Sequence, residues 1–239
     1  MKKKTGENKE LLRLDIVTAL PDMFKSVFNS SIIRIAKKKK LVKIKLHNLH
    51  DYATDKFRHI DDTPYGGGAG MLIKCEPVFA CIENLKSKRE YDQIIYLTAD
   101  GERLTQSIAN ELSMCRNVIL IAGHYKGIDQ RIRDVLVTRE ISVGDYVLSG
   151  GELPSMLLAD SIIRLIPGVI GDAESALDDS FQDGLLETPY YTKPADFQGH
   201  NVPEVLLSGN QKKINEWREE QALLKTKLRR PDLLSDSNP

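Results

Sequence analysis

The chain has 239 residues, of which 41% are hydrophobic and 28% are charged, so it can fill a core and is not expected to be disordered. Its three cysteines form no C-x-x-C pair, which argues against a disulfide scaffold or a zinc site and predicts a reducing, cytoplasmic location. The N-terminal lysines precede no apolar stretch, and Asp160 and Arg164 interrupt the most apolar segment, so neither a secretory signal nor a membrane span is expected.

The charges are unevenly distributed along a chain whose formal net charge is zero. Residues 1–60 hold 15 Lys/Arg against 6 Asp/Glu, a net of +9, whereas residues 61–210 hold 12 against 23, a net of −11. Residues 211–230 return to 7 against 3, a net of +4. Basic ends around an acidic middle favour a separate surface for phosphates, although solvated helix faces would give the same pattern.

Hydrophobic periodicity predicts an α/β domain. Five strands are expected, two from alternation and three from buried apolar runs, at 12–16, 42–46, 94–97, 118–122 and 141–143. Helices are expected at 21–40, 105–112 and 152–166. Strands that alternate with helices are typical of a parallel sheet covered on both faces.

The periodicity is lost after Gly168 and does not return before Asn210. A segment of this length without elements is typical of a linker or an active-site loop. Beyond it, apolar residues from Ile214 to Leu228 predict a helical module. The expected organisation is a polar tail at 1–11, an α/β domain at 12–168, a linker at 169–180 and a helical domain at 181–239.

Glycine-bearing loops follow three of the predicted strands, at 98–101, 123–127 and 144–151. Ligands of parallel sheets bind beyond the carboxyl ends of the strands, so these loops should share one pocket. Main-chain donors and acceptors suit an uncharged ring such as adenine, and the absence of G-x-G-x-x-G disfavours an ordinary dinucleotide site. A further glycine-rich stretch, 64–70, follows two aspartates that would repel phosphate, so base or sugar contact is more plausible there.

Other polar residues give weaker signals. Asp178 and Asp179 lie in an acidic loop, where an aspartate could act as a general base with Arg164 polarising the substrate, although such loops are usually only solvated. The five histidines show no metal-ligand spacing, and no metal site is expected.

Several segments, in matching order, resemble the bacterial tRNA (guanine-N1)-methyltransferase family, the TrmD branch of the knotted SPOUT methyltransferases. The resemblance covers about residues 12–234. It is carried by DDTPYGGG at 61–68, GHYKGID at 123–129, VGDYVLSGGEL at 143–153, LIPGV at 165–169, DSF at 179–181, VLLSGN at 205–210 and LRRP at 228–231.

The resemblance implies a parallel-sheet α/β fold with a deep C-terminal trefoil knot, plus a small helical C-terminal domain that holds tRNA. It implies a homodimer that moves a methyl group from S-adenosylmethionine to N1 of guanosine 37, just 3′ of the anticodon. It also implies that Asp179 is the general base and Arg164 its partner. The cofactor residues that it implies are Tyr96, Leu97, Thr98, Gly123, Tyr125, Val143, Gly144, Asp145, Tyr146, Val147, Leu148, Gly150 and Gly151.

Two positions depart from the family pattern. The usual Ser-Pro-Gln-Gly is Thr98-Ala99-Asp100-Gly101 here, and Lys126 stands where many members have glutamate. The second exchange reverses a charge and leaves open any role for magnesium. Two alternatives remain: a related SPOUT enzyme that methylates another RNA nucleotide, and a nonenzymatic RNA-binding protein that uses the basic N-terminal region.

Overall fold

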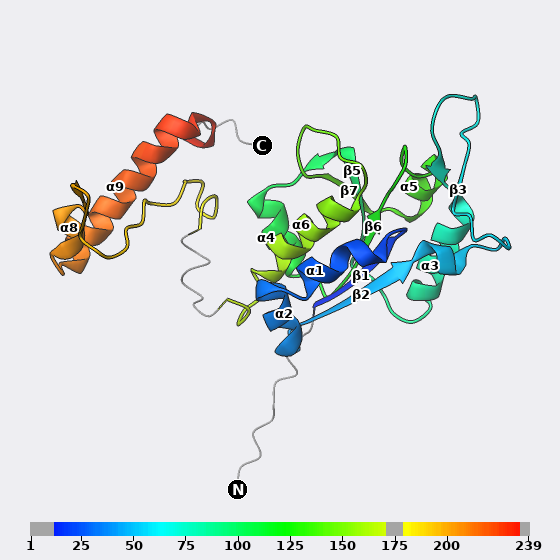
Figure 1. Ribbon diagram of the computed structural model, residues 1–239, viewed down its shortest axis with the longest axis horizontal. Coiled ribbons are helices and arrows are strands. Elements are labelled where there is room, and N and C mark those ends of the chain that lie inside the picture. The colour runs from blue at the N-terminus through cyan, green and yellow to red at the C-terminus, as the bar shows by residue number, and fades with distance from the viewer. Residues whose placement is uncertain (1–11, 171–178, 235–239) are drawn as a thin grey trace, which may run out of the picture. The chain divides into compact units, whose positions relative to one another are not determined.

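The computed structural model describes residues 12–170 and 179–234 (Figure 1). The chain divides into two compact units, Met1–Asp172 and Ala173–Pro239. Residues 1–11, and 171–178 within the predicted linker, lie outside the described ranges, so the predicted domain limits remain predictions. No helix among the described residues is long and apolar enough to cross a membrane.

The first unit is built on a five-stranded parallel sheet, which confirms the predicted α/β class. In spatial order the strands are β2 (Val42–Asn48), β1 (Leu12–Thr18), β6 (Asn117–Ala122), β5 (Gln93–Arg103) and β7 (Arg139–Ser142). A separate antiparallel pair joins β3 (Asp61–Asp62) to β4 (Leu72–Ile73). The trefoil knot implied by the resemblance remains a prediction.

Alternate residues of the central strands enter two different core layers. In β1, Leu14 and Ile16 face one layer and Val17 faces the other. The first layer is covered by η1 (Pro21–Phe24), α1 (Lys25–Phe28), α2 (Ser31–Lys38), α4 (Gln106–Ser113) and α6 (Glu152–Ile163). The second is covered by η2 (Leu49–Tyr52), α3 (Cys75–Lys86) and α5 (Gln130–Leu136). Burial of both faces explains why β6 and the first part of β5 are continuous apolar runs.

The second unit contains short elements and one long helix. They are β8 (Asp196–Phe197), β9 (His200–Asn201), α8 (Glu204–Leu207), α9 (Gln211–Arg229) and η3 (Pro231–Leu234). The buried hydroxyl of Thr226 accepts a hydrogen bond from the Leu186 amide at 2.9 Å and donates to the Ala222 carbonyl at 2.7 Å. This side chain therefore connects the chain before β8 to the last turn of α9.

The prediction of one helix over 21–40 was wrong, because the helix is interrupted at Asn29 and Ser30. The hydroxyl of Ser30 donates to the Ser26 carbonyl at 2.7 Å, and Ser31 adopts a positive φ of 47°. Serine and asparagine compete with helical hydrogen bonds in this way. The helix expected over 152–166 ends at Ile163, and α3 and α5 were not predicted.

A fully buried carboxylate, that of Asp15 in β1, connects β1 to the edge strand β2. Asp15 accepts from Arg13 Nη2 at 2.8 Å and from the Tyr91 hydroxyl at 2.7 Å, and His47 Nε2 lies 2.7 Å from it. Burial alone would raise the pKa of Asp15, but the hydrogen bonds from His47, Arg13 and Tyr91 outweigh it and hold the pKa well below its usual range.

Replacing Asp15 with asparagine should lower the free energy of unfolding by about 3–5 kcal/mol, because the buried Arg13 loses its counter-charge. Asp22→Asn, at the exposed pair with Lys25, is the control and should change little. Urea unfolding should be followed by circular dichroism. Tryptophan fluorescence would report on the second unit, which contains the single tryptophan, Trp217, whereas Asp15 lies in the first.

The stabilisation that Asp15 provides should depend on pH, because its pKa is lowered in the folded state. A lowered folded-state pKa stabilises the protein above the unfolded-chain value of about 4, and this stabilisation is lost as the pH falls towards the folded-state value. The difference in the free energy of unfolding between the native protein and Asp15→Asn should therefore become smaller in acid. Equal unfolding midpoints at pH 7 would contradict the assigned role of Asp15.

Candidate functional site

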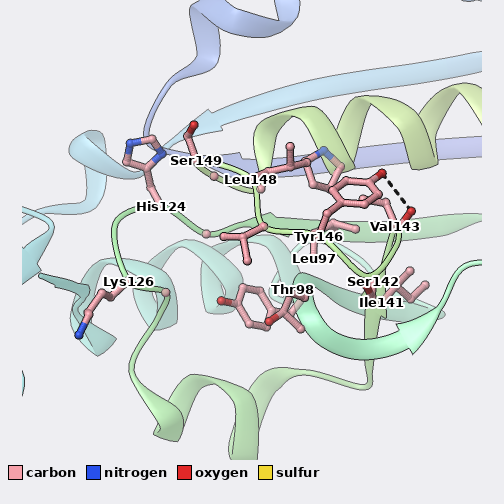
Figure 2. Close-up of a pocket in the computed structure, with 18 of the residues that line it drawn as sticks. Leu97, Thr98, His124, Lys126, Ile141, Ser142, Val143, Tyr146, Leu148 and Ser149 are labelled. Carbon is pink, nitrogen blue, oxygen red and sulfur yellow. Dashed lines mark hydrogen bonds between the residues drawn. The ribbon is translucent and has the colours of Figure 1, made fainter. Parts of the chain in front are cut away.

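Three segments enclose a cavity at the carboxyl ends of β5, β6 and β7 (Figure 2). They are the 98–101 segment inside β5, the 123–127 loop after β6 and the 143–151 loop after β7. This is the edge at which parallel sheets bind ligands. The lining residues are Tyr96, Leu97, Thr98, Ala99, Gly123, His124, Tyr125, Lys126, Gly127, Ile141, Ser142, Val143, Gly144, Tyr146, Val147, Leu148, Ser149, Gly150, Gly151 and Pro154.

The first segment is a bulge in β5. Leu97 and Glu102 both pair with Ile141, so residues 98–101 leave the ladder, and Thr98 and Ala99 line the cavity. At Gly101 a Cβ atom would lie 2.7 Å from the Glu140 carbonyl carbon. Glycine is therefore required where the bulge returns to β7.

The other two loops touch backbone to backbone. The Gly151 amide donates to the Gly123 carbonyl at 2.6 Å. A Cβ atom at Gly151 would lie 2.7 Å from Ala122 Cα and from the Gly123 nitrogen, closer than real Cβ atoms come. The end of the 143–151 loop can therefore lie against the end of β6 only because residue 151 has no side chain.

Within the 143–151 loop, the chain folds back on itself. Gly144 has a φ of +149°, and a Cβ there would meet the Tyr146 ring at 2.5 Å. The Tyr146 hydroxyl donates to the Val143 carbonyl at 3.2 Å, the bond drawn in Figure 2. This ring is half exposed and covers its own loop, so it can border a ligand without filling the cavity.

A buried carboxylate, that of Glu152, lies next to two of the cavity loops. Glu152, the first residue of α6, accepts from the Thr18 hydroxyl at 2.9 Å. His124 Nδ1 lies 3.5 Å from the other oxygen of Glu152, and a Cβ at Gly150 would meet both groups. Glu152 thus connects the end of β1 to the two loops that meet at Gly123.

Twelve of the thirteen residues predicted to bind the cofactor line this cavity. The exception is Asp145, whose side chain is exposed and is not part of the lining. Other lining residues, including His124, Ile141 and Ser142, were not predicted, although most lie in the glycine loops that the sequence singles out. Membership of those loops was the signal that could have identified them.

The two predicted catalytic residues are not among the lining residues of this cavity. Arg164 follows the last residue of α6, and α6 has 12 residues beginning beside the cavity, so about 18 Å of helix separates it from that end. Asp179 belongs to the second unit, where it lines a groove with Asp183 and Arg218. Asp178 lies outside the described residues.

The cavity fits an uncharged ring held by main-chain groups. Its lining combines glycine backbone with apolar side chains such as Leu97 and Leu148. Lys126 carries the only permanent charge among the lining residues, and Figure 2 shows its amine directed away from Tyr146 and Leu148. Burial raises the pKa of Tyr96, so this phenol is protonated at neutral pH.

The same lining does not fit a resident magnesium ion, which binds through carboxylate oxygens and waters. No carboxylate lines the cavity. Across residues 12–170 and 179–234, no group of three His, Cys, Asp or Glu side chains converges as metal ligands.

Comparison with known proteins assigns the family. The family model described as tRNA (Guanine-1)-methyltransferase TrmD matches residues 12–236. A tRNA (guanine-N(1)-)-methyltransferase of Chlorobium chlorochromatii is 59% identical over 223 residues, 93% of this chain and 96% of the relative. Proteins of the same name from Christiangramia forsetii and Bacteroides thetaiotaomicron are 57% and 55% identical, each over 94% of this chain and 100% of the relative. The match over residues 12–236 and the identity to these relatives show that this chain belongs to the tRNA (guanine-N1)-methyltransferase family.

Proposed function

We propose that this chain transfers the methyl group of S-adenosylmethionine to N1 of guanosine 37 in tRNA, in the cytoplasm. The observation that supports this most strongly is the cavity at the carboxyl edge of the sheet, in a chain of this family. Its glycine loops expose main-chain groups that suit an adenine ring. S-adenosylmethionine, when bound, supplies a methyl group on a sulfonium centre.

The proposed cofactor residues come from all three segments of the cavity. Tyr96, Leu97 and Thr98 form one wall, and Gly123 and Tyr125 come from the loop after β6. The remaining wall is the 143–151 loop, in which the Tyr146 ring leaves no room for a side chain at Gly144 and the Ala122–Gly123 backbone leaves none at Gly151. Asp145, exposed and outside the lining, is not part of this proposal.

Asp179 and Arg164 are proposed to activate the guanine. N1 of guanine carries a proton, so it becomes nucleophilic only when a base removes that proton. Asp179 would accept it, and the negative charge that then develops on O6 would be stabilised by the guanidinium of Arg164. The electron pair left on N1 forms the new bond to the methyl carbon, and the sulfur retains the electrons of the bond that breaks.

A homodimer would complete the site. Within one chain, α6 separates Arg164 from the cavity, so a second copy is a direct means of supplying it. Leu153 and Leu157, one helical turn apart on α6, are 53% and 45% exposed, and Val147 and Leu148 of the preceding loop are exposed as well. Large exposed apolar side chains near a cavity are the kind of surface that an interface buries. The proposed tRNA contact is α9, within the 211–230 segment of net charge +4.

The proposed reaction predicts which tRNA nucleotide is modified. With radiolabelled S-adenosylmethionine, a tRNA transcript with guanosine 37 should acquire label, and the same transcript with adenosine 37 should acquire none. Mass analysis of the nucleosides should identify 1-methylguanosine. Retained labelling of the adenosine 37 transcript would favour methylation of another nucleotide, and no cofactor binding at all would favour a nonenzymatic RNA-binding protein.

Replacing Asp179 with alanine should slow methyl transfer by roughly 10²- to 10⁴-fold, the usual range for loss of a general base. Cofactor affinity should hardly change, because the lost interaction acts on the transition state. Single-turnover rates with saturating tRNA measure the first effect and calorimetry the second.

Asp183→Ala is the matched control, because Asp183 lines the same groove and accepts from the Leu185 amide at 3.1 Å. It should retain most of the activity. An equal loss of methyl-transfer rate in both variants would show that the reaction depends on the negative charge or the folding of this groove. Asp179 would then not be the specific base.

A further inference from the structure

Arg133, an arginine that does not line the cavity, connects three elements beside it. Arg133, on α5, donates from Nε and Nη2 to the two oxygens of Glu140, each at 2.6 Å. Its Nη2 also donates to Asp100 Oδ2 at 2.8 Å. Glu140 belongs to β7 and Asp100 to the β5 bulge, so one guanidinium joins α5, β7 and the bulge.

The connection continues into the cavity lining. The Thr98 hydroxyl donates to the other oxygen of Asp100, and Thr98 lines the cavity. These hydrogen bonds, from Thr98 first and Arg133 second, hold the pKa of Asp100 below its usual value, so the carboxylate stays charged at neutral pH. The orientation of Thr98 thus depends on an ion pair whose cation lies on another element.

Arg133 also contacts Tyr96, the buried aromatic residue of the lining. The guanidinium carbon lies 5.6 Å from the Tyr96 ring centroid, within the range of a cation–π contact. The ring also approaches the loop after β6, where a Cβ at Gly123 would lie 3.0 Å from Tyr96 Cε2. The ring therefore contacts Arg133 and lies close to the glycine loop.

We infer that Arg133 is a positioning residue for the cofactor: it holds Thr98 and Tyr96 in their binding arrangement before the cofactor arrives. The inference rests on the proposed function. The planar guanidinium bonds Glu140 in a bidentate manner and reaches Asp100 at the same time, which a lysine ammonium cannot reproduce. Without it, residues 98–101 would have to be ordered during binding, at a cost to affinity.

The chain contains a matched control in Arg139. Its side chain is 19% exposed, against 22% for Arg133, and it also bonds two carboxylates, Glu102 at 2.8 Å and Glu111 at 3.0 Å. It joins β7 to β5 and α4, but neither Arg139 nor either partner lines the cavity. Arg133 and Arg139 therefore differ chiefly in what they hold in place.

The test is calorimetric titration of S-adenosylmethionine into the native full chain and into Arg133→Met, Arg133→Lys and Arg139→Met. Arg133→Met should weaken binding by about tenfold or more, as expected for a lost charge-assisted network. Arg133→Lys should recover only part of it, and Arg139→Met should bind within about twofold of native. In steady-state assays the KM for the cofactor should rise while kcat at saturation is retained, because Arg133 touches no reacting group.

Asp100→Asn provides a second variant that should fold, because this side chain is mostly exposed. It should weaken binding in the same direction, and the double variant with Arg133→Met should be less than additive. Native-like affinity in Arg133→Met, or equal weakening in Arg139→Met, would overturn the inference. Failure of the native chain itself to bind the cofactor would refute the proposed function, and this inference with it.

Discussion

The backbone contact between Gly151 and Gly123 is the constraint on which the rest of the site depends. Because Gly151 has no side chain, the loop after β7 can lie against the end of β6 with a 2.6 Å hydrogen bond. The contact fixes where α6 begins, and it places Glu152 in a buried position against Thr18. The three segments of the cavity are thereby held by main-chain contacts and by side chains outside it, which leaves the interior to the ligand.

The same arrangement separates binding from the proposed chemistry. The cofactor cavity lies at the first residues of α6, whereas Arg164 follows the other end of that helix and Asp179 belongs to the second unit. In the proposed reaction the cavity would bind the cofactor, whereas proton removal from guanine would also need Arg164 and Asp179, neither of which lines the cavity. A second copy and a bound tRNA would bring these groups together, so methyl transfer would depend on the correct partner being present.

Sequence patterns predicted the parallel sheet well, because strands buried on both faces are continuous apolar runs. They could not predict that β1 and β6 are neighbours, since periodicity carries no information on pairing between distant segments. Glycine motifs located most of the cavity lining, although they also contain the exposed Asp145, which is not among the lining residues. Arg133 carried no signal, because its partners Asp100 and Glu140 come together only in the folded sheet.

The central claim is that three segments of one sheet edge form a single cofactor site. Hydrogen exchange, measured by mass spectrometry with and without S-adenosylmethionine, tests this most directly. Exchange should slow in peptides that cover 96–101, 123–127 and 143–151, and it should not change over 42–48, the strand β2 at the far edge of the sheet. Slowing that spares these three segments, or that is confined to 179–190 in the second unit, would contradict the account.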